Sequence, residues 1–134
     1  MLHDIGLIYV PAEIASKPAA ERDAQEAETW ATQYDAAYQL ARGAGIPEYA
    51  CSWLLHVGER YDGTGSERMG GDRIPLESRL TRAACACQTA LAGASGDEPP
   101  LRTATKALAN RAGGDLDPKV VASLITILDR AAPT

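Results

Sequence analysis

Alanine is the most abundant residue in this chain, and its abundance constrains the fold more than any other feature of the sequence. Of the 134 residues 25 are alanine, none is phenylalanine, and aromatic residues make up only 5%. Alanine has the highest intrinsic helix propensity, whereas strands favour β-branched and aromatic residues. We therefore expect an all-α protein whose helices pack closely through small side chains.

The length and charge of the chain are those of one globular domain, which we place at residues 1–134. Hydrophobic residues make up 46%, charged residues 23%, and the net charge is -5. Ten of the 13 cationic residues are arginine, but they are scattered, so no DNA, RNA or anionic membrane partner is expected. No apolar run approaches the ~20 residues of a membrane helix, and no signal-peptide profile opens the chain. We therefore expect a cytoplasmic location.

Hydrophobic periodicity and helix-ending residues predict a bundle of about five to six helices. The expected elements are a helix tail over 1–8, a turn over 10–16, and helices over 23–42, 47–57, 75–91, 101–112 and from 117 to about 128. Glycine-rich and proline-rich segments predict loops over 62–73 and 93–100. Asp23 and Glu26 have the spacing of a capping box, and Asp117 before Pro118 is the expected cap of the last helix. The expected buried stripes are Ala27, Trp30, Ala31, Tyr34, Tyr38 and Ala41, and then Leu76, Leu80, Ala83, Ala84, Cys87 and Leu91.

The three cysteines, Cys51, Cys85 and Cys87, do not have the spacing of a zinc site. Residues two apart on a helix point to nearly opposite sides, which separates Cys85 from Cys87. We interpret all three as small buried hydrophobic residues in a reducing compartment.

Three arrangements carry chemistry-bearing residues. His3 and Asp4 are adjacent, as in sites where an imidazole and a carboxylate bind a metal, although such pairs commonly lie solvated on a surface. His56 and Glu59 are three apart on one helical face, where the alternative is a surface histidine near a helix C-terminus. The segment over 62–65 is Asp-Gly-Thr-Gly, which by itself predicts a tight turn and matches neither a phosphate loop nor a calcium loop.

The order of five blocks adds a family resemblance. The blocks HDIGLIYVP, KP, ERYDGTG, IPLESRL and AGGDLDPKVVASL resemble the bacterial HD-GYP family, the cyclic di-GMP phosphodiesterase branch of the HD phosphohydrolase superfamily. The similarity covers residues 3–128. It implies a helical bundle with a centre of two or three metal ions, iron or manganese, that hydrolyses a cyclic dinucleotide. It also implies a loop that docks other signalling domains, notably cyclase domains.

The chain departs from the pattern of that family at most metal-ligand positions. The resemblance implies metal binding by His3 and Asp4, with His56 as a displaced candidate and Asp4 as the catalytic residue of an active site. Ligand positions of the family are substituted at Gln33, Val57, Gly58 and Cys85. One or more helices that the family has before the His-Asp pair are missing, so we expect an N-terminally truncated member.

Because few metal-ligand positions are kept, we have one main expectation for the function and three alternatives. We expect a degenerate, non-catalytic signalling module that meets a partner protein through the 62–72 loop, with Glu59, Arg60, Asp62, Gly63 and Gly65 as its ordering and binding residues. One alternative is a metal-dependent phosphodiesterase that acts on cyclic di-GMP or a related nucleotide. Another is a protein that binds a cyclic dinucleotide without cleaving it, with Arg60, Arg68 and Arg73 on the phosphates. The third is a decayed product without an independent role.

Overall fold

The computed structural model describes residues 2–132, and those residues form helices without any strand. An isolated bridge pairs Ala112 with Leu116. The expectation of an all-α fold is therefore confirmed. The chain divides into two compact units, residues 1–58 and residues 59–134, which we call unit 1 and unit 2 and describe separately. None of the described helices is long and apolar enough to cross a membrane.

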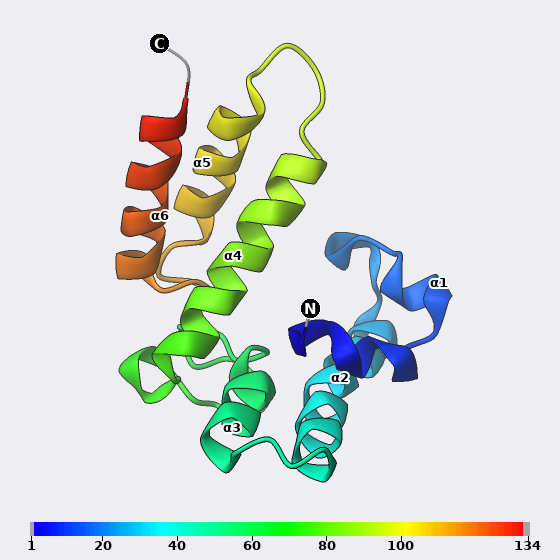
Figure 1. The fold of residues 1–134 in the computed structure, drawn as a ribbon. Helices are drawn as coiled ribbons and strands as arrows, with labels where there is room; N and C mark the ends of the chain where they lie inside the picture. Colours follow the sequence, from blue (N-terminus) through cyan, green and yellow to red (C-terminus); the bar gives the residue numbers. More distant parts are fainter. Residues whose placement is uncertain (1, 133–134) are drawn as a thin grey trace. The chain divides into compact units, whose positions relative to one another are not determined.

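Unit 1 is built on one long helix. Its elements are η1 (Leu2–Tyr9), α1 (Ala12–Ala15), η2 (Ala19–Glu21), α2 (Ala24–Gly43) and α3 (Glu48–His56), where η denotes a 3-10 helix (Figure 1). The capping box at the start of α2 is confirmed. Asp23 Oδ1 accepts the backbone N–H of Glu26 at 2.8 Å, and the carboxylate of Glu26 accepts the N–H of Asp23 at 3.1 Å.

The face of α2 that is buried differs from the expected stripe. Gln33, Ala37 and Ala41 are buried, whereas Ala27 and Ala31 are exposed, so the expectation for the last two was wrong. The buried residues follow one another at four-residue steps, which places them on a single face of the helix. Ala37 and Ala41 pack with two buried residues of α3, Cys51 and Leu54. The contact face of α2 is therefore formed by Gln33, Ala37 and Ala41, and the aromatic residues Trp30, Tyr34 and Tyr38 are half-buried.

Unit 2 contains η3 (Gly71–Arg73), α4 (Leu76–Ala92), α5 (Pro100–Arg111) and α6 (Pro118–Ala131), and the three α-helices lie side by side (Figure 1). Proline occupies the first position of α5 and of α6, where its missing N–H costs nothing. The buried core of these helices is formed by Ala83, Ala86, Cys87, Ala104, Leu108, Leu116, Val120, Val121 and Leu128.

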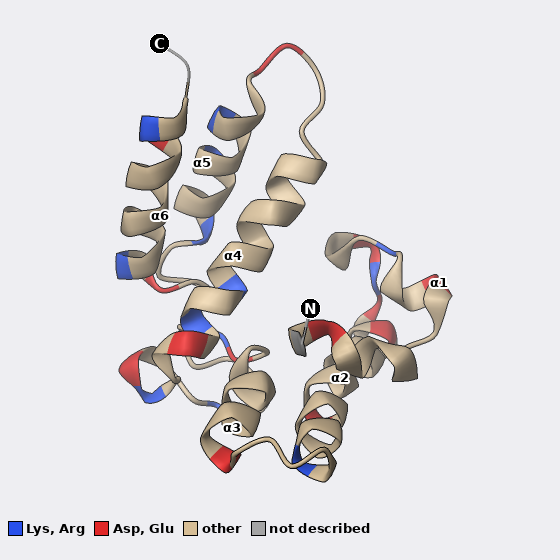
Figure 2. Ribbon diagram, in the orientation of Figure 1, with Lys and Arg blue, Asp and Glu red and all other residues tan. Residues whose placement is uncertain are grey.

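The first half of α4 buries a polar face. Leu76 and Leu80 are 49% and 48% exposed and Ala84 is exposed, so the expectation that these three are buried was wrong. The apolar core takes its α4 members only from Ala83 onward. Before that point the buried side of the helix carries Ser78, with the mostly covered side chains of Arg79 and Arg82 near it. Charged residues on α4 accordingly lie in its first half, and none follows Arg82 before the helix ends (Figure 2).

The prediction that all three cysteines are buried is confirmed in part. Cys51 and Cys87 are buried, and Cys85 is half-buried. Burial raises the pKa of the Cys87 thiol, which keeps it protonated and unreactive near neutral pH.

Candidate functional site

The His-Asp pair lies in η1 of unit 1. The Nε2 atom of His3 is 3.2 Å from Oδ1 of Asp4, so the imidazole and the neighbouring carboxylate face each other. The side chain of His3 is 20% exposed and that of Asp4 is 51% exposed. The two candidate metal donors therefore form a local pair at the surface of the unit.

The segment that follows the pair lies directly on α2. A Cβ atom on Gly6 would be 1.8 Å from the carbonyl oxygen of Gln33, a distance that no side chain could tolerate. Gln33 is 3% exposed, and its Nε2 donates to the carbonyl of Trp30 at 3.2 Å. The structure thus brings Gln33, where the family resemblance implies a substituted ligand, close to the segment that carries His3 and Asp4. An amide in this place is a poor metal ligand and is used for packing.

Two more substituted positions lie after the end of α3. Val57 is 7% exposed, and a Cβ atom on Gly58 would be 2.4 Å from the ring of Tyr34. Tyr34 is the residue that follows Gln33 on α2. His56 is half-buried, and its Nδ1 atom is buried without a hydrogen-bond partner among the described residues. Among the described residues, His56 is therefore the candidate donor that has a buried polar atom without a hydrogen-bond partner.

These residues do not fit a binuclear metal centre. A hydrolytic centre needs about three protein ligands per metal and an open position for water. In the part of the chain from residue 2 to residue 132, no group of three or more His, Cys, Asp and Glu side chains is arranged to hold a metal ion. The donors that the family resemblance names in unit 1 are an adjacent pair, His3 and Asp4, and His56 at the end of α3.

Two residues of unit 2 that the family resemblance singles out, Glu59 and Asp62, order a loop. Glu59 is 2% exposed, and its carboxylate accepts the backbone N–H of Glu67 at 2.8 Å and of Met69 at 3.3 Å. The hydroxyl of Ser66 lies 3.4 Å from the same carboxylate. Gly65 passes beside it, with room for no Cβ atom, since one would be 2.5 Å from Oε2 of Glu59. The role of Glu59 is to close the loop on itself.

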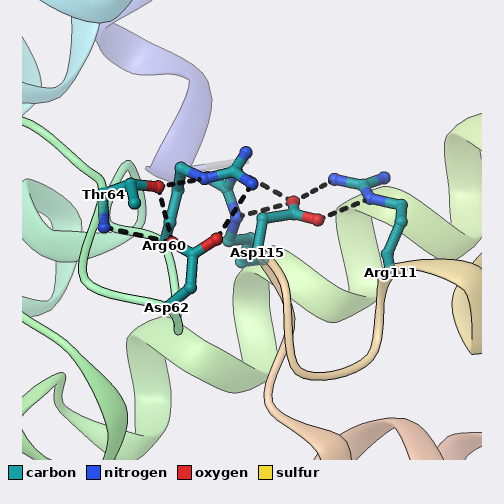
Figure 3. Close-up of polar contacts among 6 residues, drawn as sticks. Arg60, Asp62, Thr64, Arg111 and Asp115 are labelled. Atoms are coloured by element: carbon teal, nitrogen blue, oxygen red, sulfur yellow. Dashed lines mark hydrogen bonds and ion pairs between the residues drawn. The ribbon is translucent and has the colours of Figure 1, made fainter.

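Asp62 orders the first turn of the same loop (Figure 3). Its Oδ1 atom accepts the hydroxyl of Thr64 at 2.6 Å and the backbone N–H of Thr64 at 3.1 Å. Arg60 donates to Oδ2 of Asp62 at 3.2 Å and to the hydroxyl of Thr64 at 2.8 Å. The Thr64 hydroxyl, and after it the Arg60 guanidinium, lower the pKa of Asp62 to about 2. Gly63 has a φ of +78°, which a glycine adopts without strain.

A second carboxylate, Asp115, fastens this loop to the helices of unit 2. Asp115 is 7% exposed and accepts a hydrogen bond from Arg111 Nε at 2.9 Å (Figure 3). Arg82 Nη2 donates to the same carboxylate at 3.0 Å. Arg111 Nη2 bonds to the same carboxylate. On the backbone, the N–H of Tyr61 donates to the carbonyl of Asp115 at 3.3 Å, and the N–H of Asp62 donates to that of Gly114 at 2.8 Å.

A parallel contact lies two residues further on. Asp117 is 2% exposed, accepts Arg79 Nη1 at 2.6 Å, and caps α6 by accepting the N–H of Lys119 at 2.8 Å. The expected cap of the last helix by Asp117 is therefore confirmed. Sequence reasoning assigned no role to Asp115, Arg79 or Arg82, and it did not pair Asp117 with Arg79. Two features of the sequence could have indicated these contacts. They are a pair of acidic residues two apart before α6 and a pair of arginines three apart on one face of α4.

The comparison with protein families identifies the fold that carries these contacts. The family model for the HD domain matches residues 1–120. The chain belongs to the HD-domain family and has the fold of the HD phosphohydrolases. No curated protein matches the chain.

Replacement of Asp115 by asparagine should loosen unit 2. The variant keeps the shape of the side chain but leaves the guanidiniums of Arg82 and Arg111 without their anion. We expect the free energy of unfolding to fall by about 2 kcal/mol, less than for a fully buried pair because Arg111 is 42% exposed. Urea unfolding followed by far-UV circular dichroism measures it. The exposed loop residue Asp97 provides the control, and equal effects of D115N and D97N would contradict this role.

The same contact predicts an acid-sensitive fold. Burial by itself raises the pKa of Asp115, but Arg111 and Arg82 outweigh it, so the pKa lies below its ordinary value of 3.8. A lowered folded-state pKa contributes stability that is present above about pH 4 and is lost as the pH falls through the lowered value. The difference in unfolding free energy between wild type and D115N should therefore be constant from pH 7 to about pH 5 and shrink below about pH 4. A difference that grew on acidification would contradict the assignment.

Proposed function

We propose that this chain is a non-catalytic interaction or regulatory module of the HD-domain family, and that it meets a signalling partner through the loop of residues 62–72. The observation that carries the proposal is the set of hydrogen bonds that Glu59 and Asp62 make. The carboxylate oxygens of Glu59 and Asp62 accept hydrogen bonds from N–H and hydroxyl groups of their own loop. Those bonds order a surface instead of leaving the oxygens open for a metal ion.

The donor chemistry of unit 1 supports the same proposal. His3 and Asp4 are the family donors that remain, and they contact each other. Glutamine, valine and glycine stand at positions 33, 57 and 58, and none of these side chains is a good ligand for iron or manganese. Without further donors a hydrolytic centre would hold its metals weakly. The fold itself confers no activity.

The loop presents a fixed backbone with charged side chains at its surface. Ser66, Glu67 and Arg68 are exposed, while Glu59 beneath them holds the backbone of Glu67 and Met69. A surface that is ordered before binding costs a partner less conformational entropy than a mobile one. The order of the five blocks, with GluArgTyrAspGlyThrGly over 59–65, favours the HD-GYP branch and a bacterial, cytoplasmic signalling context.

A second candidate function has one observation in its favour. The buried Nδ1 atom of His56 has no hydrogen-bond partner among residues 2–132, and a metal ion would satisfy it. With His3 and Asp4 it would belong to a metal-dependent phosphodiesterase that uses iron or manganese on cyclic di-GMP. Simple binding of a cyclic dinucleotide has less support, since Arg60 already donates to Asp62 and Thr64, although Arg68 and Arg73 remain exposed.

A binding measurement tests the module. Because the resemblance points to cyclase domains as partners, the probe is a purified diguanylate cyclase domain, titrated onto the immobilised chain. E59Q removes the negative charge that holds the loop and replaces one acceptor oxygen with an NH2 group, which can only donate. It should weaken binding at least about tenfold, equivalent to 1.4 kcal/mol. D97N, in the other long loop of unit 2, should leave binding unchanged.

Two outcomes would overturn the proposal. Equal affinity after replacement of residues 62–72 by a glycine-serine linker would exclude the loop. Hydrolysis of cyclic di-GMP by manganese-loaded protein, abolished in D4A, would establish the enzyme in place of the module.

A further inference from the structure

Two glycines bring neighbouring segments against the same short stretch of α2. Gly6 of η1 meets the backbone of Gln33, and Gly58, after the end of α3, meets the ring of Tyr34. A Cβ atom would be 1.8 Å from the nearest atom at position 6 and 2.4 Å at position 58. Carbon atoms in contact are normally about 3.5–4.0 Å apart, so neither position has room for any side chain.

The contact at Gly58 involves a large part of the Tyr34 ring. The Cδ2, Cε2 and Cγ atoms of Tyr34 would lie 2.4, 2.6 and 3.0 Å from that Cβ atom. Tyr34 is half-buried and lies on α2 between Gln33, which is 3% exposed, and Ala37, which is 1% exposed. The ring therefore occupies the volume that a side chain at position 58 would need.

We propose that Tyr34 and Gly58 form a matched packing pair, which leaves this end of unit 1 closely packed and not a metal site that has merely lost its donors. Membership of the HD-domain family leads one to expect metal ligands at this end of unit 1. Two observations contradict that expectation. The donors are missing, and the space is filled. A single substitution that returned a histidine to position 58 would meet the ring of Tyr34.

The pair deepens the proposed non-catalytic function, but its test does not involve the 62–72 loop or any partner. Failure of the loop proposal would leave the pair intact, and the reverse also holds. The chain offers a convenient reporter, because both tryptophans, Trp30 and Trp53, belong to unit 1. Tryptophan fluorescence therefore follows the unfolding of this unit.

A double-mutant cycle tests the pair. G58A should lower the melting temperature measured by tryptophan fluorescence by about 5 °C or more, because its methyl group overlaps the ring. Y34A should lower it as well, since it leaves a cavity. In the Y34A background, G58A should cost less than half of what it costs in the wild type. If G58A alone fails to fold, the double variant should fold.

Gly43 provides the matched control, since it ends α2 and a Cβ atom there would have no heavy atom within 4 Å. G43A should melt within about 2 °C of the wild type. A G58A protein that melts like G43A would overturn the proposal. So would an equal loss from G58A in both backgrounds, or a double variant that fails to fold where Y34A alone folds.

Metal uptake provides a second readout. G58H should take up no more Zn²⁺ or Mn²⁺ than the wild type in equilibrium dialysis, since the imidazole cannot enter while Tyr34 is present. A G58H protein that gains one bound metal ion per chain and keeps the wild-type melting temperature would show that position 58 is open. That result would overturn the pair.

Discussion

The carboxylate of Asp115 is the contact on which unit 2 depends. Arg82 from α4 and Arg111 from the end of α5 both donate to it, and the backbone of the same segment receives the N–H groups of Tyr61 and Asp62. One residue thereby connects two helices and the loop that Glu59 orders. A carboxylate that is 7% exposed would be costly without these donors. Together with the contact between Asp117 and Arg79, it explains why arginines lie on the covered side of the first half of α4.

Unit 1 differs from unit 2 in its packing, because its segments contact each other through small residues. Ala37 and Ala41 pack with Cys51, and Gly6 and Gly58 allow η1 and the end of α3 to reach the surface of α2. The abundance of alanine and the absence of phenylalanine suit this close approach. Close packing is also incompatible with long ligand side chains at the glycine positions. The same residues that stabilise the unit leave no space for an additional imidazole.

The sequence predicted the class of fold and most helix ends, because these depend on local signals such as the capping box at Asp23 and the proline before α4. It assigned the wrong exposure to Ala31 and Leu80, since periodicity does not say which side of a helix its neighbours will cover. Glu59 and Asp62 were found through their motif, and the bonds that they make inside the loop were not. Asp115 was missed because Arg82 is brought to it only by tertiary structure, and because its contact with Arg111, four residues before it, spans the end of α5 and not a turn of helix.

The central claim is that the surviving signature residues hold a loop and that the remaining donors do not hold metal ions. Its most direct test is elemental analysis of the chain after loading with Mn²⁺ or Fe²⁺ and removal of unbound ions, carried out in parallel on D4A. We predict no more than about 0.1 metal ion per chain in both proteins, because a pair of adjacent donors binds weakly. One or two metal ions per wild-type chain, lost in D4A, would contradict the account.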